Sequence, residues 1–219
     1  MCNLYSMTRN REAIARLFRV PHNRAVSVEP QHAIFPGYEA PVVRATEDGE
    51  RELVKMSWGF VLLQKGRAPR RVTNARDDKI LTSRFWRPSF EHRRCLVPVS
   101  SYCEPKGEKP ATWHWFALKG DEARPLFAFP GIWTTYRGPI KKDGPDVAIE
   151  TYSFMTTEPN ELTVSINHER MPVLLSEPAE FDTWLNGSVD EAFALARPYP
   201  AQQMRIVQEG PERMDLLAA

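Results

Sequence analysis

Four apolar segments in the middle of the chain, three of them rich in aromatic residues, set the main limit on its fold. They span residues 95–99, 112–118, 126–133 and 147–157, and polar or proline-containing stretches separate them. Aromatic and β-branched residues favour strands. Helical segments do not alternate regularly with them, as they would in a parallel βαβ sheet. The order of segments therefore predicts one α+β domain with a curved, mainly antiparallel sheet.

The remaining segments are shorter and lie around this β-rich centre. Residues 55–63 are predicted to form a strand in which Gly59 marks a bulge or a close approach of another segment. Further short strands are predicted at 25–28, 33–35, 171–175 and 204–208. The apolar spacing predicts helices at 9–19 with Thr8 as N-cap, at 77–90 with Pro88 ending it, at 158–164, at 176–185 between Ser176 and Gly187, and at 190–196.

Composition narrows the class of protein. The chain has three cysteines, which fits a reducing cytosol and no disulfide framework. It has no run of about 18 apolar residues and no secretory h-region at its start, so we expect no membrane association. A cytoplasmic protein that acts as a monomer is the expectation from these features.

Positive charge is concentrated in one stretch of a nearly neutral protein. The net charge of the chain is +1, yet residues 65–94 carry ten Lys or Arg against three Asp or Glu. Localised positive charge indicates an anionic partner such as nucleic acid, although a solvated basic face gives the same pattern.

The first two residues, Met1 and Cys2, are a candidate reactive group. If Met1 is removed, Cys2 carries an α-amine with a pKa of about 7.7–8.0 and a thiol with a pKa of about 8.5 on adjacent carbons. Both groups are nucleophiles near neutral pH. Together they can condense with an aldehyde to an imine and then close a five-membered thiazolidine.

Three polar stretches are the other candidates for chemistry. They are Thr73-Asn74-Ala75-Arg76, Ser101-Tyr102-Cys103-Glu104-Pro105, and Asn167-His168-Glu169-Arg170-Met171-Pro172. The five histidines show no paired ligand spacing and CxxC is absent, so we expect no metal and no small-molecule cofactor. Any one of these stretches alone is more often structural than functional.

Taken in order and spacing, these stretches resemble the SRAP family (SOS response-associated peptidase, or abasic-site-processing, proteins). The resemblance also includes Trp58-Gly59 and Thr82-Ser83-Arg84, and it covers the chain from Met1 to about residue 208. It implies one SRAP-like α+β domain over residues 1–219, with a barrel-like β core over about 2–208 and peripheral helices. It also implies a protein that crosslinks covalently to abasic sites in single-stranded DNA.

The resemblance, with the residue chemistry, gives each candidate a role. Cys2 is the nucleophile, Glu104 a general base and His168 a general acid that opens the abasic sugar ring. Asn74 positions Cys2 or the sugar. Phosphates would be contacted by Arg70, Arg71, Arg76 and Arg84, and Trp58 or another aromatic residue would stack on a base. Association with the nucleoid when DNA is damaged would follow.

Two other classes of function stay open, and some positions depart from the family pattern. Cys2, His168 and Glu104 would also suit a cysteine-type autopeptidase that removes Met1, or the basic stretch could serve a non-catalytic single-strand binding module. Strand cleavage by β-elimination through the imine would be a side reaction. The family usually has Gly-Arg where this chain has Asn3-Leu4, an aromatic at Pro105, and Glu at Asp78.

Overall fold

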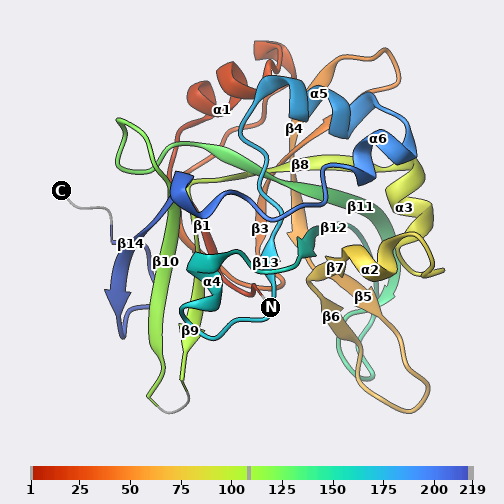
Figure 1. The fold of residues 1–219 in the computed structure, drawn as a ribbon. Coiled ribbons are helices and arrows are strands. Elements are labelled where there is room, and N and C mark those ends of the chain that lie inside the picture. The colour runs from red at the N-terminus through yellow and green to blue at the C-terminus, as the bar shows by residue number, and fades with distance from the viewer. Residues whose placement is uncertain (1, 108–109, 217–219) are drawn as a thin grey trace.

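Five strands close into a barrel at the centre of the molecule (Figure 1). This computed structural model describes residues 2–107 and 110–216. Around the barrel the strands follow the order β11-β8-β3-β4-β12, and β12 pairs with β11 to complete the ring. The barrel strands are β3 (Glu39–Ala45), β4 (Arg51–Trp58), β8 (Arg94–Val99), β11 (Phe127–Pro139) and β12 (Asp146–Thr157). All their pairings are antiparallel except that of β4 with β12.

A second, antiparallel sheet continues from the barrel. Its order is β14-β10-β9-β1-β2. Its strands are β1 (Tyr5–Met7), β2 (Gln31–Ile34), β9 (Ser101–Lys106), β10 (Thr112–Leu118) and β14 (Met204–Gly210). The chain passes from β8 into β9 at Ser100, whose amide donates to the carbonyl of Ser6 at 2.9 Å. The predicted α+β class with a barrel-like, mainly antiparallel core is therefore confirmed.

Gly59 ends the barrel strand β4 and starts a two-stranded ribbon. The ribbon consists of β5 (Phe60–Leu62) and β6 (Arg70–Val72). Gly59 has a φ of +100°, and a Cβ there would lie 3.0 Å from Cβ of Arg71. Only glycine suits this left-handed backbone at close approach. The predicted close approach at Gly59 is confirmed, whereas the single strand predicted over 55–63 is divided into β4 and β5. Two short strands, β7 (Asn74–Arg76) and β13 (Met171–Pro172), pair with β12.

Helices cover the barrel from outside (Figure 1). They are α1 (Arg11–Phe18), α2 (Asp77–Ile80), α3 (Arg87–His92), α4 (Glu161–Val164), α5 (Pro178–Asn186) and α6 (Val189–Phe193), with 3₁₀ turns at His22–Arg24 and Ala201–Gln203. No helix of the described residues is both long and apolar enough to span a membrane.

Three predicted helix boundaries were wrong. Asn10, not Thr8, caps α1, because its side chain accepts the amide of Ala13. Glu177, not Ser176, caps α5. Pro88 lies in the first turn of α3 instead of ending the predicted helix at 77–90, because proline lacks only an N–H that the first turn leaves unpaired.

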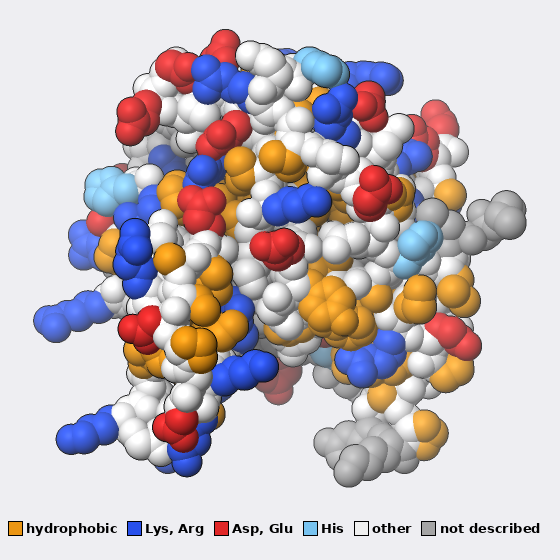
Figure 2. All heavy atoms as spheres, turned by 180° about the vertical axis from the view of Figure 1, so that it is seen from behind, with side chains coloured by type: hydrophobic (Ala, Val, Ile, Leu, Met, Phe, Trp, Pro, Cys, Tyr) orange, Lys and Arg blue, Asp and Glu red, His pale blue; other side chains and the backbone are white. Residues whose placement is uncertain are grey.

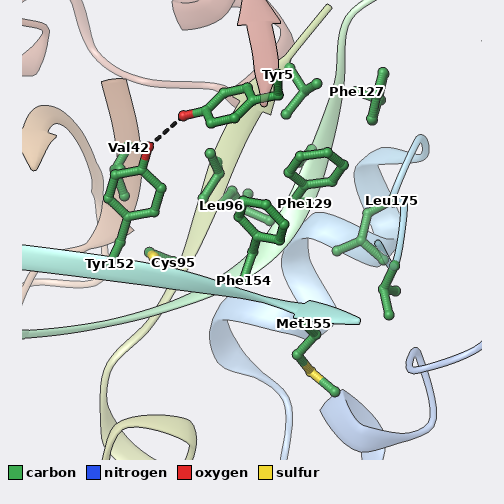
Figure 3. Close-up of a cluster of buried hydrophobic side chains, with 14 of the residues drawn as sticks. Tyr5, Val42, Cys95, Leu96, Phe127, Phe129, Tyr152, Phe154, Met155 and Leu175 are labelled. Atoms are coloured by element: carbon green, nitrogen blue, oxygen red, sulfur yellow. Dashed lines mark hydrogen bonds between the residues drawn. The ribbon is translucent and has the colours of Figure 1, made fainter. Parts of the chain in front are cut away.

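Aromatic side chains join the second sheet to the barrel. Tyr5, from β1, packs edge-on against Trp58, Phe129 and Phe154 in the barrel interior. Its hydroxyl lies 2.5 Å from the hydroxyl of Tyr152 (Figure 3). These buried contacts fix the backbone only three residues after Cys2, so the start of the chain is held in place by the core.

Candidate functional site

The register of two strands brings Cys2 beside Glu104. In the antiparallel pair β1–β9, Tyr5 lies opposite Tyr102, and the amide of Cys103 donates to the carbonyl of Leu4 at 2.9 Å. Residues before Leu4 therefore run alongside the residues that follow Cys103. Cys2 and Glu104 are both buried, each with 1% of its surface exposed. Met1 lies outside the described residues, so its removal stays a prediction.

Asn74 holds the backbone of Cys2. Parallel pairing of β7 with β12 places Asn74 opposite Phe154. Its Nδ2 donates to the carbonyl of Cys2 at 2.8 Å and to Oγ1 of Thr73 at 2.6 Å. Thr73 in turn donates to Oδ1 of Asn3 at 2.9 Å. Two adjacent residues thus clamp the chain on both sides of the Cys2–Asn3 peptide bond.

His168 lies against Glu104. Its Nδ1 is 3.4 Å from Oε2 of Glu104, and its Nε2 is 2.7 Å from the carbonyl oxygen of Pro105. A carbonyl only accepts, so Nε2 carries a hydrogen and Nδ1 faces the carboxyl group. The turn before His168 has Asn167 at a φ of +65°, a left-handed conformation that asparagine tolerates. This turn follows α4, whose N-cap is Asn160.

Burial sets the proton affinities of this pair. It raises the pKa of Glu104 to about 7, and it lowers the pKa of His168. Desolvation disfavours the charged form of each group, which explains the opposite directions. Near neutral pH, the site can therefore exchange a proton between a carboxyl group and an imidazole.

The thiol of Cys2 is kept protonated. Burial, followed by the charge of Glu104, raises the pKa of the Cys2 thiol well above its ordinary value. Its Sγ lies 3.5 Å from the carbonyl oxygen of Leu4, at the range of a weak thiol hydrogen bond. A pre-formed thiolate is therefore disfavoured at neutral pH.

A cavity of about 160 Å³ opens onto this group. It is lined by Asn3, Leu4, Cys103, Glu104, Pro105, Trp113, His168 and Arg213. In Figure 1 the second sheet lies on one side of the start of the chain and the β5–β6 ribbon on the other. Larger surface hollows exist elsewhere, but this small one is where the predicted Glu104 and His168 come together.

The arginines predicted to bind phosphate differ in exposure and in the contacts that they already make. Arg70 and Arg84 are exposed and make no ion pair with another described residue. Arg76 is exposed but forms a bidentate pair with Asp78 at 2.9 and 2.8 Å. Arg71 is partly buried, and its Nη1 donates to the carbonyl of Gly59 at 2.8 Å. Successive side chains of a strand point to opposite faces, so Arg70 and Arg71 point to different faces of β6. They were predicted to act as a pair.

Positive charge projects on the side of the ribbon. Figure 2 shows Lys and Arg side chains at the lower left of the rear face, where the β5–β6 and β11–β12 connections of Figure 1 project. These connections carry the exposed Lys65, Arg67, Lys141 and Lys142. Arg93 and Arg94 instead donate to backbone carbonyls, one in β11 and one at the end of α5.

Trp58 belongs to the core, which corrects the prediction that it stacks on a base. None of its surface is exposed, and its ring stacks on Phe154 with centroids 5.2 Å apart. Its Nε1 donates to the carbonyl of Thr73 at 3.2 Å. Trp58 therefore supports the residue before Asn74 and has no free ring face.

Sequence reasoning missed His114 and the C-terminal contribution to the cavity. His114 lies directly opposite Glu104 in the β9–β10 register. The strand alignment could have revealed it, had 101–106 been predicted as a strand. Among residues 2–107 and 110–216, no cluster of His, Cys, Asp and Glu suits a metal ion.

Comparison with known proteins gives one family. The model of the SOS response associated peptidase (SRAP) family matches residues 1–210. The abasic site processing protein YoqW of Bacillus subtilis is 30% identical over 189 residues, covering 82% of this chain and 81% of YoqW. YoaM, an abasic site processing protein of the same organism, is 29% identical and covers 82% and 78%.

Solved structures share the fold. A protein from Bacteroides thetaiotaomicron superposes with a TM-score of 0.71 at 24% identity, covering 93% of this chain and 90% of that one. A protein from Bordetella bronchiseptica gives 0.73 at 20% identity, covering 93% and 97%. At these identities the likeness establishes the fold alone.

Proposed function

This chain belongs to the SOS response associated peptidase (SRAP) family, and from this premise we propose that it processes abasic sites in single-stranded DNA. Its relatives YoqW and YoaM are named abasic site processing proteins. After removal of Met1, Cys2 forms a covalent thiazolidine with the abasic sugar, and the crosslink shields the lesion.

One observation carries this proposal. Asn74, 72 residues away in the sequence, donates from Nδ2 to the carbonyl of Cys2 at 2.8 Å, and the cavity beside Asn3 is lined by Glu104 and His168. A reactive group that must attack one carbon gains most from being held in a fixed orientation. A cysteine with no role at the start of a chain would have no need of such a clamp.

The chemistry needs only the aldehyde and the two groups of Cys2. The α-amine adds to the C1′ aldehyde of the ring-opened sugar, and one water leaves as the imine forms. The thiol then adds across the C=N bond: sulfur bonds to C1′, and the thiol proton passes to nitrogen. No electrons are gained or lost, so the sum is protein plus aldehyde giving thiazolidine plus water.

Glu104 and His168 move the protons in this scheme. Glu104, with its pKa raised to about 7 by burial, takes a proton from the Cys2 ammonium. His168 delivers a proton to the ring oxygen of the sugar from Nε2, once the sugar displaces the Pro105 carbonyl that Nε2 contacts here, and this favours the open aldehyde. Their separation of 3.4 Å supports passage of a proton from one to the other between these steps.

The state of the thiol supports the amine as the first nucleophile. A cysteine peptidase requires an activated thiolate with a lowered pKa. Here burial and the Glu104 charge raise the pKa of the Cys2 thiol. This favours imine formation before ring closure, and it weighs against a cysteine-type peptidase that attacks with sulfur.

The exposed arginines supply the contact with DNA. Arg70 and Arg84 are available to phosphates, and Arg76 becomes available when it leaves Asp78. Phosphate contacts set the register of a strand without reading its sequence, which suits a protein that must act on a lesion in any sequence. The half-buried Arg71 shapes the ribbon through Gly59 and contributes less to this surface.

A denaturing gel tests the proposal. The mature protein is incubated with a single-stranded oligonucleotide that carries one abasic site, and a matched oligonucleotide without the site is the control. A shifted band should form without borohydride, because the closed ring has no imine to reduce. Cys2→Ala should give a band only with borohydride. A band of equal strength from Cys2→Ala without reduction would exclude the thiazolidine.

A further inference from the structure

A short segment that follows the family match lies across the second sheet. The match ends at residue 210, and residues 211–216 continue beyond β14. One side chain from each of the five strands of the sheet forms a hydrogen bond with this segment. The five are Gln208 (β14), Trp115 (β10), Ser101 (β9), Ser6 (β1) and His32 (β2).

Asp215 is the anchor of the segment. Its side chain is fully buried and accepts from both Nε and Nη2 of Arg124, at 3.0 and 2.7 Å. It also accepts from Ser6 at 3.0 Å and from Ser101 at 2.5 Å. A buried carboxylate with this many donors fixes the backbone around it, so the segment is a built part of the fold.

The anchor holds Arg213 at the cavity. Its guanidinium lies 4.7 Å from the ring centroid of Trp113 and 4.9 Å from that of Phe35. Arg213 is exposed and makes no ion pair or hydrogen bond to another described residue. Stacking on aromatic faces leaves the N–H groups at the edge of the guanidinium able to donate.

Arg213 is also the only Lys or Arg among the residues that line this cavity, all of which the structure describes. Leu4, on the same wall, is apolar and packs with Trp115. In Figure 1, β14 lies on the opposite side of the barrel from the β5–β6 ribbon. The cavity therefore has one permanent cation of its own, separate from the basic ribbon.

We propose that Arg213 is a positioning residue that binds the phosphate next to the abasic sugar. This inference rests on the proposed function. An arginine fork matches the two free oxygens of a phosphodiester, and a strand whose sugar enters the cavity must carry a phosphate past its rim. Arg213 would bind a phosphate on one side of the abasic sugar, and the arginines of the β5–β6 ribbon would bind phosphates on the other.

The test separates this contact from the covalent chemistry. Affinity is measured for a single strand with one tetrahydrofuran abasic analogue, which has no aldehyde and cannot crosslink. Matched strands carry a neutral methylphosphonate on the 5′ or the 3′ side of the analogue. Wild type, Arg213→Gln and Arg213→Lys are compared, and Arg16→Gln on α1 is the control, because Arg16 is exposed and outside the cavity.

Loss of a charge-assisted hydrogen bond should weaken binding by Arg213→Gln roughly tenfold. A methylphosphonate on one side of the analogue should weaken DNA binding by wild type to a similar degree and leave the affinity of Arg213→Gln unchanged. Arg213→Lys should fall between, and Arg16→Gln should bind like wild type. Equal affinity of Arg213→Gln and wild type would overturn the proposal. So would a further loss of affinity in Arg213→Gln when either methylphosphonate strand is used, because the two losses would then be independent. Failure of wild type to crosslink a true abasic site would instead refute the proposed function and leave this result standing.

Discussion

His168 Nδ1 lies 3.4 Å from Oε2 of Glu104 in a site where burial raises the pKa of the carboxyl group to about 7. The same burial lowers the pKa of His168. A pair of this kind changes its protonation near neutral pH.

The rate of adduct formation should depend on Glu104 and on pH. If Glu104 takes a proton from the Cys2 ammonium, the rate should rise as pH passes through about 7 and Glu104 ionises. Glu104→Gln should lose this rise and slow the reaction by about 10²–10⁴-fold, as removal of a positioned base usually does. Time courses from pH 5.5 to pH 8.5 measure it. If Glu104→Gln showed the same dependence of rate on pH as wild type, Glu104 would have a structural role only.

Thermal unfolding reports the same ionisation without any DNA. The native protein holds the Glu104 proton more tightly than the unfolded chain, because the folded pKa is raised from 4.5 to about 7. This contribution to stability is complete below pH 4.5 and is lost as pH rises through 7. The Tm of Glu104→Gln relative to wild type should therefore increase between pH 5 and pH 8. A constant difference would mean that Glu104 is already ionised at pH 5.

Asn74 should matter for the rate of crosslinking and little for DNA binding. Asn74→Asp keeps the shape of the side chain but removes the Nδ2 donor to the Cys2 carbonyl. Misplacement of the nucleophile should slow adduct formation by about 10²-fold. Asn186→Asp, at the exposed end of α5, is the matched control. Equal rates for Asn74→Asp and wild type would remove Asn74 from the site.

Salt should weaken binding of an undamaged single strand. Arg70→Gln with Arg84→Gln removes two exposed cations and should make the dependence of affinity on salt less steep by about 1–2 units of the logarithmic slope. Asp78→Asn should have the opposite effect, because it frees Arg76 from its bidentate pair. Fluorescence anisotropy across a salt series measures both. Slopes that do not differ would place the DNA elsewhere.

Trp58→Phe should lower stability before it affects DNA binding. The change removes the Nε1 donor to the carbonyl of Thr73 in a fully buried site. An unpaired buried acceptor and a smaller ring should cost about 1–3 kcal/mol of unfolding free energy. Denaturant unfolding and affinity for undamaged DNA would be compared. Weaker DNA binding with unchanged stability would restore Trp58 as a base-stacking residue.

The sequence predicts those parts of this fold in which local pattern and burial agree. The aromatic run at 112–118 coincides with β10, and the predicted strand at 147–157 differs from β12 by one residue. The barrel-like core was expected only from the family resemblance. Strand patterns alone do not predict its closure, because the parallel pairing of Thr151 with Ser57 joins segments far apart in the chain.

Strands with polar or proline residues were missed for a physical reason. β9 contains Glu104 and Pro105, and β3 contains Pro41, so neither has the pattern of a buried strand. Glu104 is nevertheless almost fully buried, and a buried carboxyl group is what the proposed chemistry uses. The motifs predicted Cys2, Asn74, Glu104 and His168 correctly as neighbours, whereas Trp58 and Arg71 turned out to have structural contacts.

The most direct measurement asks whether the amine of Cys2 is the nucleophile. An uncleavable extra residue placed before Cys2 keeps the thiol and the folded site but turns the α-amine into an amide. The variant and the mature wild type are incubated with the abasic oligonucleotide, and intact mass is recorded. Wild type without Met1 should gain the mass of the oligonucleotide less one water, and the blocked variant should remain unmodified with or without borohydride. A full yield of adduct from the blocked variant would contradict attack by the amine.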